Sequence, residues 1–368
     1  MAATDYRVIG LMSGSSLDGA DIAYCHIHFN NGKWTYQIIQ AETIDYPAKW
    51  KLRLKKLVLQ NAITYLRTDV YFGHFLGELL NTFIDAHGIR SDIDFIASHG
   101  QTVFHQPENN VTSQIGDGAA IAAKTRLPVV CNFRTVDVAF SGQGAPIAPI
   151  ADQYFFSGYK IFLNLGGISN LSFILPDKII GYDVSPCNLV LNALAEKIGF
   201  DFDDRGEHAA KGLFDEKLFD ELNQSWYYAK DYPKTLSGGF VSKVMMPVFK
   251  HYPITADDKL RTMCEHIAHQ ISRELNKINK SQNLNLSKAD KMLVTGGGAF
   301  NDYLISRIAE LSPLSIEIPD EQTIKFKEAL LTALMGVLRM RNEVNCFSSV
   351  TGASQNNIGG AVYAGQVV

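Results

Sequence analysis

The first apolar segments of the chain alternate with polar residues at the period of a β-strand. Residues 7–12 and 20–29 show this pattern on either side of the turn SGSSLDG, and the run DIAYCHIHF is its clearest part. Alternation with period two turns one face of each strand toward a core. The two segments therefore predict a half-buried antiparallel hairpin.

A helical period follows the hairpin. Apolar residues recur at helical spacing through residues 66–89, and Gly88 after His87 marks the end of this helix. Residues 91–104, SDIDFIASHGQTVF, then predict a short strand that runs into a polar loop. This order of strand, helix and strand indicates an α/β fold.

The second half of the chain repeats this order. Residues 160–183 hold an apolar strand, a Gly-Gly turn and an alternating strand. Residues 291–312 hold a strand, a triple-glycine turn and an amphipathic helix, with Asn301 or Asp302 as its N-cap. The two halves therefore look like variants of one design. Residues 131–152, rich in Gly, Pro and small residues, are where we expect the chain to cross between two lobes.

The composition narrows the classes of partner. The 368 residues, 46% of them hydrophobic, suffice for two medium domains. A formal net charge of −4 gives no electrostatic reason to expect nucleic acid or an anionic membrane surface as a partner. Five widely separated cysteines without a C-x-x-C pair fit a reducing cytosol, and no signal sequence or membrane-spanning stretch is visible. We expect a cytoplasmic protein with a small-molecule ligand.

Three glycine-rich turns are the candidate ligand-binding elements of the chain. They are SGSSLDG after the first strand, NLGGISN in the second half and TGGGAFN before an amphipathic helix. Small residues let backbone N–H groups approach a phosphate, so the three turns together suit a polyphosphate with a nucleoside at the third turn. The G-x-x-x-x-G-K-[ST] and G-x-G-x-x-G nucleotide loops are absent. A single turn of this composition more often only reverses the direction of the chain and binds no ligand, and that alternative stays open.

Longer blocks of the sequence carry a family resemblance. The chain contains GLMSGSSLDGAD, SHGQTVFHQP, QIGDGAAIA, NFRTVDVAFSGQGAPIAP, NLGGISN, GYDVSPCN, TGGGAFN and SVTGAS. From residue 8 onward it resembles the anhydro-N-acetylmuramic acid kinases, which belong to the actin-like ATPase and sugar kinase superfamily. The resemblance implies an α/β fold of two actin-like, ribonuclease H-like lobes. Each lobe would have a mixed five-stranded sheet, and ATP and a sugar would bind in the inter-lobe cleft.

The resemblance also implies a domain division. We expect residues 1–138 to form the N-terminal lobe, with the sugar site and the first phosphate loop. Residues 139–368 would form the C-terminal lobe, with the second phosphate loop and the nucleoside pocket. A last helix in residues 356–368 is expected to cross back to the first lobe. The sequence leaves a homodimer open.

By this resemblance, the three turns bind the cofactors ATP and Mg²⁺. The first phosphate loop would bind the β- and γ-phosphates through Ser13, Gly14, Ser15 and Ser16. Asp18 would hold the magnesium ion through water. The second phosphate loop would consist of Asn164, Gly166 and Gly167, and the nucleoside pocket of Gly296, Gly297, Gly298 and Asn301.

The block GYDVSPCN aligns with the family segment that holds the catalytic aspartate, which implies that Asp183 is catalytic. In the implied reaction, Asp183 takes a proton from a water that attacks the anomeric carbon of a 1,6-anhydro sugar. The freed O6 then accepts the γ-phosphoryl group of ATP, as in a phosphotransferase with an alcohol acceptor that serves cell-wall recycling. Without the resemblance, Asp183 is better interpreted as a cap of the following helix or as an Asx-turn before Pro186.

The same likeness assigns a sugar site. Its residues would be His99, Gln101, Thr102, Arg134, Asp137 and Asn188. Arg134 would hold the lactyl carboxylate of a muramic acid through two parallel hydrogen bonds. Taken singly, His99 is a loop histidine bonded to backbone, and Arg134 with Asp137 is a surface ion pair. These alternatives stay open.

Two segments depart from the family pattern. The family has Gly-Pro-Gly-Asn where this chain has Ser185, Pro186, Cys187 and Asn188, so two positions able to adopt positive φ carry a Cβ. After Lys234, the usual Ser-Thr-Gly-Arg-Glu continuation is missing. Two alternative functions follow: a kinase for another anhydrosugar or amino sugar, and a non-catalytic nucleotide-binding sensor.

Overall fold

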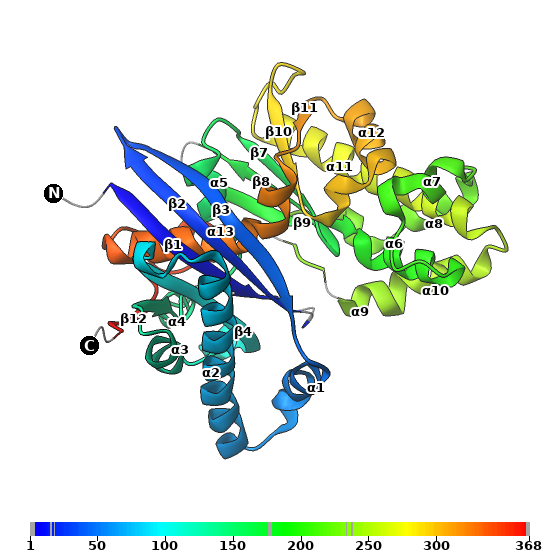
Figure 1. Ribbon diagram of the computed structural model, residues 1–368. Helices are drawn as coiled ribbons and strands as arrows, with labels where there is room; N and C mark the ends of the chain where they lie inside the picture. Colours follow the sequence, from blue (N-terminus) through cyan, green and yellow to red (C-terminus); the bar gives the residue numbers. More distant parts are fainter. Residues whose placement is uncertain are drawn as a thin grey trace. The chain divides into compact units, whose positions relative to one another are not determined.

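The structure, a computed structural model, describes residues 4–14, 17, 19–175, 179–232, 234–236 and 238–365. The chain divides into two compact units (Figure 1). The first unit is Met1–Ser157 with Phe326–Val368, and the second is Gly158–Lys325. The expected boundary at 138/139 thus falls inside the first unit, and the chain returns to that unit at Phe326.

The first unit is built on a mixed seven-stranded sheet. Its strands are β1 (Asp5–Ser13), β2 (Gly19–Asn30), β3 (Lys33–Asp45), β4 (Phe95–Gln106), β5 (Val111–Ile115), β6 (Val129–Cys131) and β12 (Ala361–Tyr363). The strand order is β12-β6-β4-β1-β2-β3, and β5 pairs with β4. Strands β1, β2 and β3 are antiparallel neighbours, whereas β1, β4 and β6 run parallel. The described sheet thus exceeds the five strands that the resemblance implies.

Helices cover both faces of this sheet (Figure 1). They are α1 (Ala48–Lys56), α2 (Ala62–His87), α3 (Gly118–Thr125), α4 (Thr135–Ala139), α5 (Ala148–Phe155), α13 (Glu321–Met340) and α14 (Ser348–Thr351). Successive residues of β1 belong to different apolar cores, since Val8 packs with α13 and Ile9 with α2. Helix α13 lies so close to β1 that a Cβ on Gly10 would be 1.9 Å from the backbone oxygen of Ala329. Glycine at this position is therefore required by packing.

The second unit has a mixed five-stranded sheet. Its strands are β7 (Ile161–Leu165), β8 (Ile168–Ile174), β9 (Ile179–Pro186), β10 (Lys291–Thr295) and β11 (Ser315–Glu317), in the order β11-β10-β7-β8-β9. Strands β7, β8 and β9 are antiparallel, and β7, β10 and β11 run parallel. This repeats the arrangement of β1-β2-β3 and β1-β4-β6. The prediction that the two halves share one design is confirmed.

One apolar core joins the second sheet to its helices. These helices are α6 (Asn188–Ala195), α7 (Glu207–Lys211), α8 (Glu216–Asn223), α9 (Gly238–Phe240), α10 (Met246–Val248), α11 (Ala256–Ser281) and α12 (Asp302–Leu311). Leu163 of β7 and Leu171 of β8 pack with Ile271 of α11 in this core. Across the described parts of both units, no helix combines the length and the apolar character that a membrane span needs.

Several predicted elements are confirmed. The opening hairpin is β1 and β2, which pair antiparallel. The predicted helix ends at His87, and Gly88 adopts the left-handed conformation with φ of 62°. Asn301 is the N-cap of α12, and its side chain accepts a hydrogen bond from the N–H of Leu304.

Two predicted elements are wrong. The segment after Ser98 is not a polar loop, because β4 continues to Gln106 and pairs with β5 from Gln101 onward. The last segment is not a helix, because Ala361–Tyr363 form β12 and pair with β6. This strand still belongs to the first unit.

The Gly- and Pro-rich segment 131–152 is not the crossing between units, since the chain leaves the first unit after Ser157. Its small residues form a loop around the carboxylate of Asp137. The N–H of Gly144 donates to Asp137 Oδ2 at 2.8 Å, and a Cβ on Gly142 would lie 2.2 Å from the same oxygen. The composition therefore reflects a tight loop instead of a linker.

Acid is expected to destabilise the protein through His266, a buried residue of α11. Its Nε2 accepts from the hydroxyl of Tyr228 at 2.8 Å, and its Nδ1 lies 2.9 Å from Asn223 Oδ1. Burial, and then the nearby His269, lower the pKa of His266 to about 3. The unfolded chain takes up a proton near pH 6.5 and the folded chain does not. This contribution to stability is therefore complete above pH 6.5 and is lost as the pH falls toward 3.

Between pH 7 and pH 5, His266 accounts for a loss of about 2 kcal/mol in the free energy of unfolding. Urea unfolding at both pH values measures it in the wild type and in His266→Gln, whose amide can replace both hydrogen bonds. The variant is expected to lose about 2 kcal/mol less than the wild type over this interval. An equal loss in both proteins would contradict the assignment.

Candidate active site

Four polar side chains form a row across the sheet of the second unit. The strand register pairs Thr295 of β10 with Asn164 of β7. Asn164 pairs in turn with Asn170 of β8, and Asn170 pairs with Asp183 of β9. Paired residues of neighbouring strands point to the same face of a sheet. The predicted catalytic residue and Asn164 of the second phosphate turn therefore share one face.

The carboxylate of Asp183 is held by the segment 234–236. Thr235 Oγ1 and Leu236 N each donate a hydrogen bond to its Oδ2, both at 2.8 Å. Among the described residues, no hydrogen bond reaches Oδ1, so this oxygen can accept a proton from a ligand or water. Asp183 is neither a helix cap nor the centre of an Asx-turn, because α6 begins after Cys187 without a side-chain cap and the carboxylate bonds to Thr235 and Leu236.

The second and third glycine turns meet in the second unit. Gly296 has φ of +85°, and a Cβ there would lie 2.6 Å from Asn164 Oδ1. Asn188 links the two turns, because its Nδ2 donates to the backbone oxygen of Leu165 at 2.9 Å. A Cβ on Gly298 would lie 3.1 Å from Asn188 Oδ1. Asn188, predicted as a sugar ligand, thus lies among the glycine turns.

One glycine of these turns has room for a Cβ, and a second is opposed only by the end of a side chain. A Cβ on Gly297 would find its nearest atom, Asn188 Nδ2, at 3.5 Å, and one on Gly166 would find Asn164 Nδ2 at 3.3 Å. Neither glycine has a positive φ. Gly297 leaves space over the backbone, which an anionic ligand needs in order to reach N–H groups, whereas at Gly166 the end of the Asn164 side chain would have to shift by a few tenths of an ångström. These positions therefore fit a phosphate cradle.

Alanine substitutions are expected to separate ligand binding from folding at this turn. Gly297→Ala should leave the free energy of unfolding within about 0.5 kcal/mol. It should weaken ATP binding about tenfold, because the methyl group fills the space over the backbone. Gly296→Ala should lower the free energy of unfolding by about 1–3 kcal/mol, since its φ and Asn164 both oppose a Cβ. Urea unfolding and ATP calorimetry measure both effects, and unchanged ATP affinity in Gly297→Ala would contradict the cradle.

Asn301 serves the fold at the third turn. Its Oδ1 accepts from the N–H of Leu304 at 2.9 Å, and a Cβ on Gly206 would lie 2.1 Å from this oxygen. Arg205, next to Gly206, pairs with Asp302 at 3.2 Å. Capping and close packing thus account for the Asn301 side chain, and its place in a nucleoside pocket stays a prediction.

The first phosphate turn is described in part. Ser13 is buried, and its hydroxyl donates to Gln101 Oε1 at 2.6 Å and accepts from the hydroxyl of Tyr46 at 2.7 Å. Leu17 N donates to the backbone oxygen of Gly14 at 3.2 Å. The fold thus joins Ser13 to Gln101, a predicted sugar residue. The predicted roles of Ser15, Ser16 and Asp18, including the Mg²⁺ site, lie outside the described residues.

His99 and Arg134 form a second pair in the first unit. Arg134 Nε donates to His99 Nε2 at 3.0 Å, and His99 Nδ1 lies 2.9 Å from the backbone oxygen of Gly100. Since a carbonyl oxygen only accepts, the proton of neutral His99 is on Nδ1. Burial, and then the charge of Arg134, lower the pKa of His99 to about 3, so the ring is neutral at pH 7. Among the described residues, no hydrogen bond reaches the terminal nitrogens of Arg134.

Asp137 is fully buried and bound by the fold. Its Oδ1 accepts from Thr351 Oγ1 and Asn357 Nδ2, both at 2.8 Å, in addition to the bond from Gly144 to Oδ2. A surface ion pair with Arg134 is therefore wrong for this residue. Three donors within the unit indicate that Asp137 fixes the loops on either side of it. Thr102 is half-buried on β4 and pairs with Gln114 of β5.

Sequence analysis missed two carboxylates that interact electrostatically, Asp21 of β2 and Glu328 of α13. Asp21 Oδ1 accepts from Thr43 Oγ1 at 2.6 Å, and burial raises the pKa of Asp21. Desolvation by the surrounding protein raises the pKa of Glu328, Asp21 raises it further, and Arg134 opposes the rise. The Glu328 side chain nevertheless keeps solvent access. Because Glu328 lies in an ordinary amphipathic pattern, the sequence held no signal for it.

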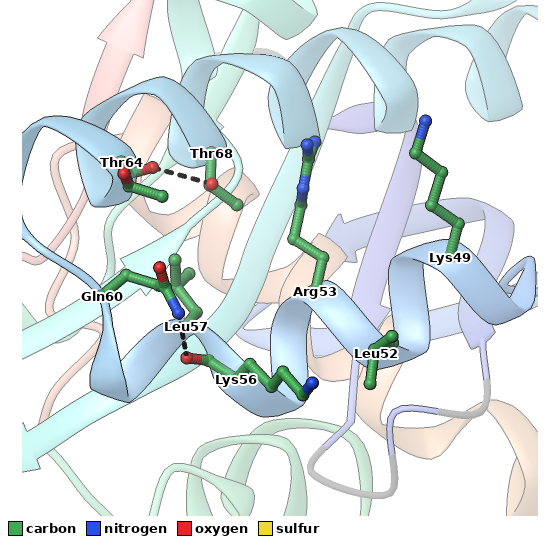
Figure 2. A pocket seen from close by; sticks show the side chains of 8 residues that line it. All are labelled: Lys49, Leu52, Arg53, Lys56, Leu57, Gln60, Thr64 and Thr68. Carbon is green, nitrogen blue, oxygen red and sulfur yellow. Dashed lines mark hydrogen bonds between the residues drawn. The ribbon is translucent and has the colours of Figure 1, made fainter.

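A pocket of about 250 Å³ lies apart from these residues, between α1 and α2 (Figure 2). Lys49 and Arg53 extend from α1 toward α2 in this view, and Thr68 donates to the backbone oxygen of Thr64 at 2.8 Å. The pocket is lined by Lys49, Leu52, Arg53, Lys56, Leu57, Gln60, Thr64 and Thr68. None of the predicted site residues lines it.

Comparisons with known proteins agree along nearly the whole chain. The family model for anhydro-N-acetylmuramic acid kinase matches residues 6–365. The anhydro-N-acetylmuramic acid kinase of Sulfurovum sp. (strain NBC37-1) is 32% identical, with 97% of this chain and 99% of that protein aligned. The enzyme of the same name from Francisella tularensis subsp. novicida (strain U112) is 31% identical over 96% of this chain and 97% of that protein.

Among solved structures, the activator of the 2-hydroxyisocaproyl-CoA dehydratase from Clostridium difficile with bound ADPNP superposes with a TM-score of 0.43. It is 13% identical, and the alignment covers 91% of this chain and 96% of that one. The family match and the two relatives span the glycine turns, the Asp183 row and the His99–Arg134 pair together. This chain therefore belongs to the anhydro-N-acetylmuramic acid kinase family.

Proposed function

We propose that this protein uses ATP to open and phosphorylate 1,6-anhydro-N-acetylmuramic acid. A water oxygen bonds to the anomeric carbon, the bond between that carbon and O6 breaks, and O6 takes the γ-phosphoryl group of ATP. The products are N-acetylmuramic acid 6-phosphate, ADP and one proton. We place the reaction in cell-wall recycling in the cytoplasm, a reducing compartment suited to five buried cysteine thiols.

The geometry of Asp183 is the observation that carries this proposal. Its Oδ2 is fixed by two donors, whereas Oδ1 has no hydrogen-bond partner among the described residues. A carboxylate with one oxygen fixed and one open is suited to take a proton from a positioned water. Asp183 would hold that proton while the carbon–oxygen bond forms, and release it to solvent afterwards.

The glycine turns support nucleotide binding. Gly297 leaves space over the backbone beside Asn188, and at Gly166 the nearest atom is the amide nitrogen of Asn164, at the end of its side chain. We propose that N–H groups of these turns bind the phosphates, with Gly296, Gly298 and Asn301 shaping the nucleoside pocket. Mg²⁺, proposed to bind near Asp18, would neutralise part of the charge on the transferring phosphoryl group.

The first unit supports sugar binding. Arg134 presents two terminal nitrogens, and the neutral ring of His99 holds its Nε. We propose that this guanidinium binds the lactyl carboxylate, and that Gln101 and Thr102 contact the sugar hydroxyls. Ser13 connects this group to the first phosphate turn through its bond to Gln101.

The first departure from the family pattern is accommodated by the fold. Ser185 is buried in β9, where its N–H donates to Ser169 Oγ at 3.2 Å. Cys187 has φ of −132°, so neither substituted position needs a left-handed backbone. The segment still brings Asn188 to the glycine turns. The departure therefore gives no structural reason to prefer another substrate.

Turnover in ¹⁸O-labelled water tests the function. With ATP, Mg²⁺ and anhydro-N-acetylmuramic acid, the label should appear at the anomeric oxygen and not in the phosphate. Mass spectrometry of the quenched product locates it. Unlabelled product held in labelled water for the same time controls for exchange. Label in the phosphate would mean hydrolysis of ATP, and absence of product would reject the proposed reaction.

A further inference from the structure

A buried ion pair lies directly before the second departure from the family pattern. Lys234 Nζ donates to Glu274 Oε1 at 2.8 Å, and the two side chains are 1% and 3% exposed. The hydroxyl of Tyr182 donates to Glu274 Oε2 at 3.1 Å. The ammonium nitrogen also lies 5.1 Å from the ring centre of Tyr227. Lys234 thus points into the core of the second unit and is unavailable to grip a ligand.

Lys234 is also the first residue of the segment that holds Asp183. The N–H of Asp183 donates to the backbone oxygen of Lys234 at 3.3 Å. The next two residues, Thr235 and Leu236, supply both hydrogen bonds to Asp183 Oδ2. Tyr227, which faces the ammonium group, donates its hydroxyl to the backbone oxygen of Asp183 at 2.7 Å. Backbone and carboxylate of Asp183 therefore both connect to the ion pair through short paths.

We propose that the Lys234–Glu274 pair is a positioning device for the catalytic carboxylate. Separating two opposite charges inside a core is unfavourable, so the pair restricts the place of Lys234. Lys234 in turn fixes Thr235 and Leu236, whose hydrogen bonds aim Asp183 Oδ1 at its target. The proposal rests on the proposed function, because orientation of this oxygen matters only if Asp183 acts on a substrate.

Stability alone does not account for such a pair. Well-packed apolar side chains in place of a buried ion pair are often neutral or stabilising, whereas removal of one partner is destabilising. A purely structural pair would therefore give back full activity once an apolar replacement restores stability. A positioning pair would not.

Kinetics of two variants separate these roles. Lys234→Met should lower kcat about 10²-fold, which a displacement of about 1 Å can cause, with KM for ATP within about twofold. Lys234→Met/Glu274→Met should recover thermal stability but not kcat. Recovery of kcat together with stability would overturn the proposal. Glu265→Gln is the control. Glu265 lies on α11, as Glu274 does, and accepts hydrogen bonds from Arg307 and Tyr303 without contacting segment 234–236.

A double-mutant cycle tests the path through Thr235. Thr235→Val removes the hydroxyl that bonds to Asp183, and Thr235→Ser keeps it. If Lys234 acts through this segment, Lys234→Met/Thr235→Val should lose no more kcat than the worse single variant. Thr235→Ser should keep most of the wild-type kcat. Multiplicative losses in the double variant would show that Lys234 acts by another route.

Crystal structures of the wild type and of Lys234→Met/Glu274→Met give an answer that does not depend on activity. The bond from Thr235 Oγ1 to Asp183 Oδ2, 2.8 Å in the wild type, should lengthen or break in the variant. An unchanged bond would overturn the positioning role. An inactive wild type would instead reject the proposed function, and the crystallographic comparison would still decide whether the pair positions Asp183.

Discussion

Asp183→Asn is expected to lower kcat by about 10² to 10⁴-fold while ATP binding is retained. The amide oxygen of Asn can accept the bonds from Thr235 and Leu236, so the local geometry survives. The amide group cannot take a proton from water, so the proposed general base would be lost. Sugar-dependent release of ADP measures kcat, and calorimetry with a non-hydrolysable ATP analogue measures binding.

Asp231→Asn is the matched control for this experiment. Asp231 lies close in sequence to segment 234–236 but is exposed, and it pairs with Lys277. Its substitution should leave kcat unchanged. Full turnover in Asp183→Asn would exclude Asp183 as the general base. Loss of ATP affinity together with kcat would mean that Asp183 serves the nucleotide site or the fold.

Local patterns predicted the parts of the fold that depend on neighbouring residues. The alternation in β1 and β2 and the glycine after His87 are properties of short stretches, and each gave the correct element. The same reasoning failed after Ser98. The side chains of Ser98, His99 and Gln101 are polar but buried, so a half-exposed pattern is missing even though β4 continues.

The candidate site depends on contacts between distant segments. Glu274 belongs to a helix whose polar residues suggest a solvated face, yet Glu274 and His266 are buried there. Their partners Lys234 and Tyr228 lie 40 and 38 positions away in the chain. No period or spacing encodes such a pairing.

Asp137 shows the same limit of sequence reasoning. Its spacing from Arg134 suggested a local ion pair, but its donors Thr351 and Asn357 are 214 and 220 positions away. The family resemblance singled out the block NFRTVDVAFSGQGAPIAP, which contains Asp137, and the block SVTGAS, which contains Thr351. It did not distinguish a residue that binds a ligand from one that holds the loop beside it.

Arg134→Ala is expected to remove the preference of the enzyme for a sugar that bears a carboxylate. A bidentate, charge-assisted contact contributes about 1.5–3 kcal/mol, which corresponds to about 10- to 150-fold in kcat/KM. This loss should affect anhydro-N-acetylmuramic acid and spare the anhydro amino sugar that lacks the lactyl group. Arg134→Lys should recover only part of it, because an ammonium group has no planar fork.

Comparison of kcat/KM for the two sugars separates carboxylate recognition from structural damage. Arg134 also donates to His99, so a collapsed pocket would weaken both sugars equally and would contradict a specific contact. Arg7→Ala is the control, since Arg7 forms an exposed ion pair with Asp92 in the same unit. The Arg7→Ala substitution should change kcat/KM for neither sugar. Selective loss for the carboxylate-bearing sugar, absent from Arg7→Ala, would identify the terminal nitrogens of Arg134 as the group that recognises muramic acid.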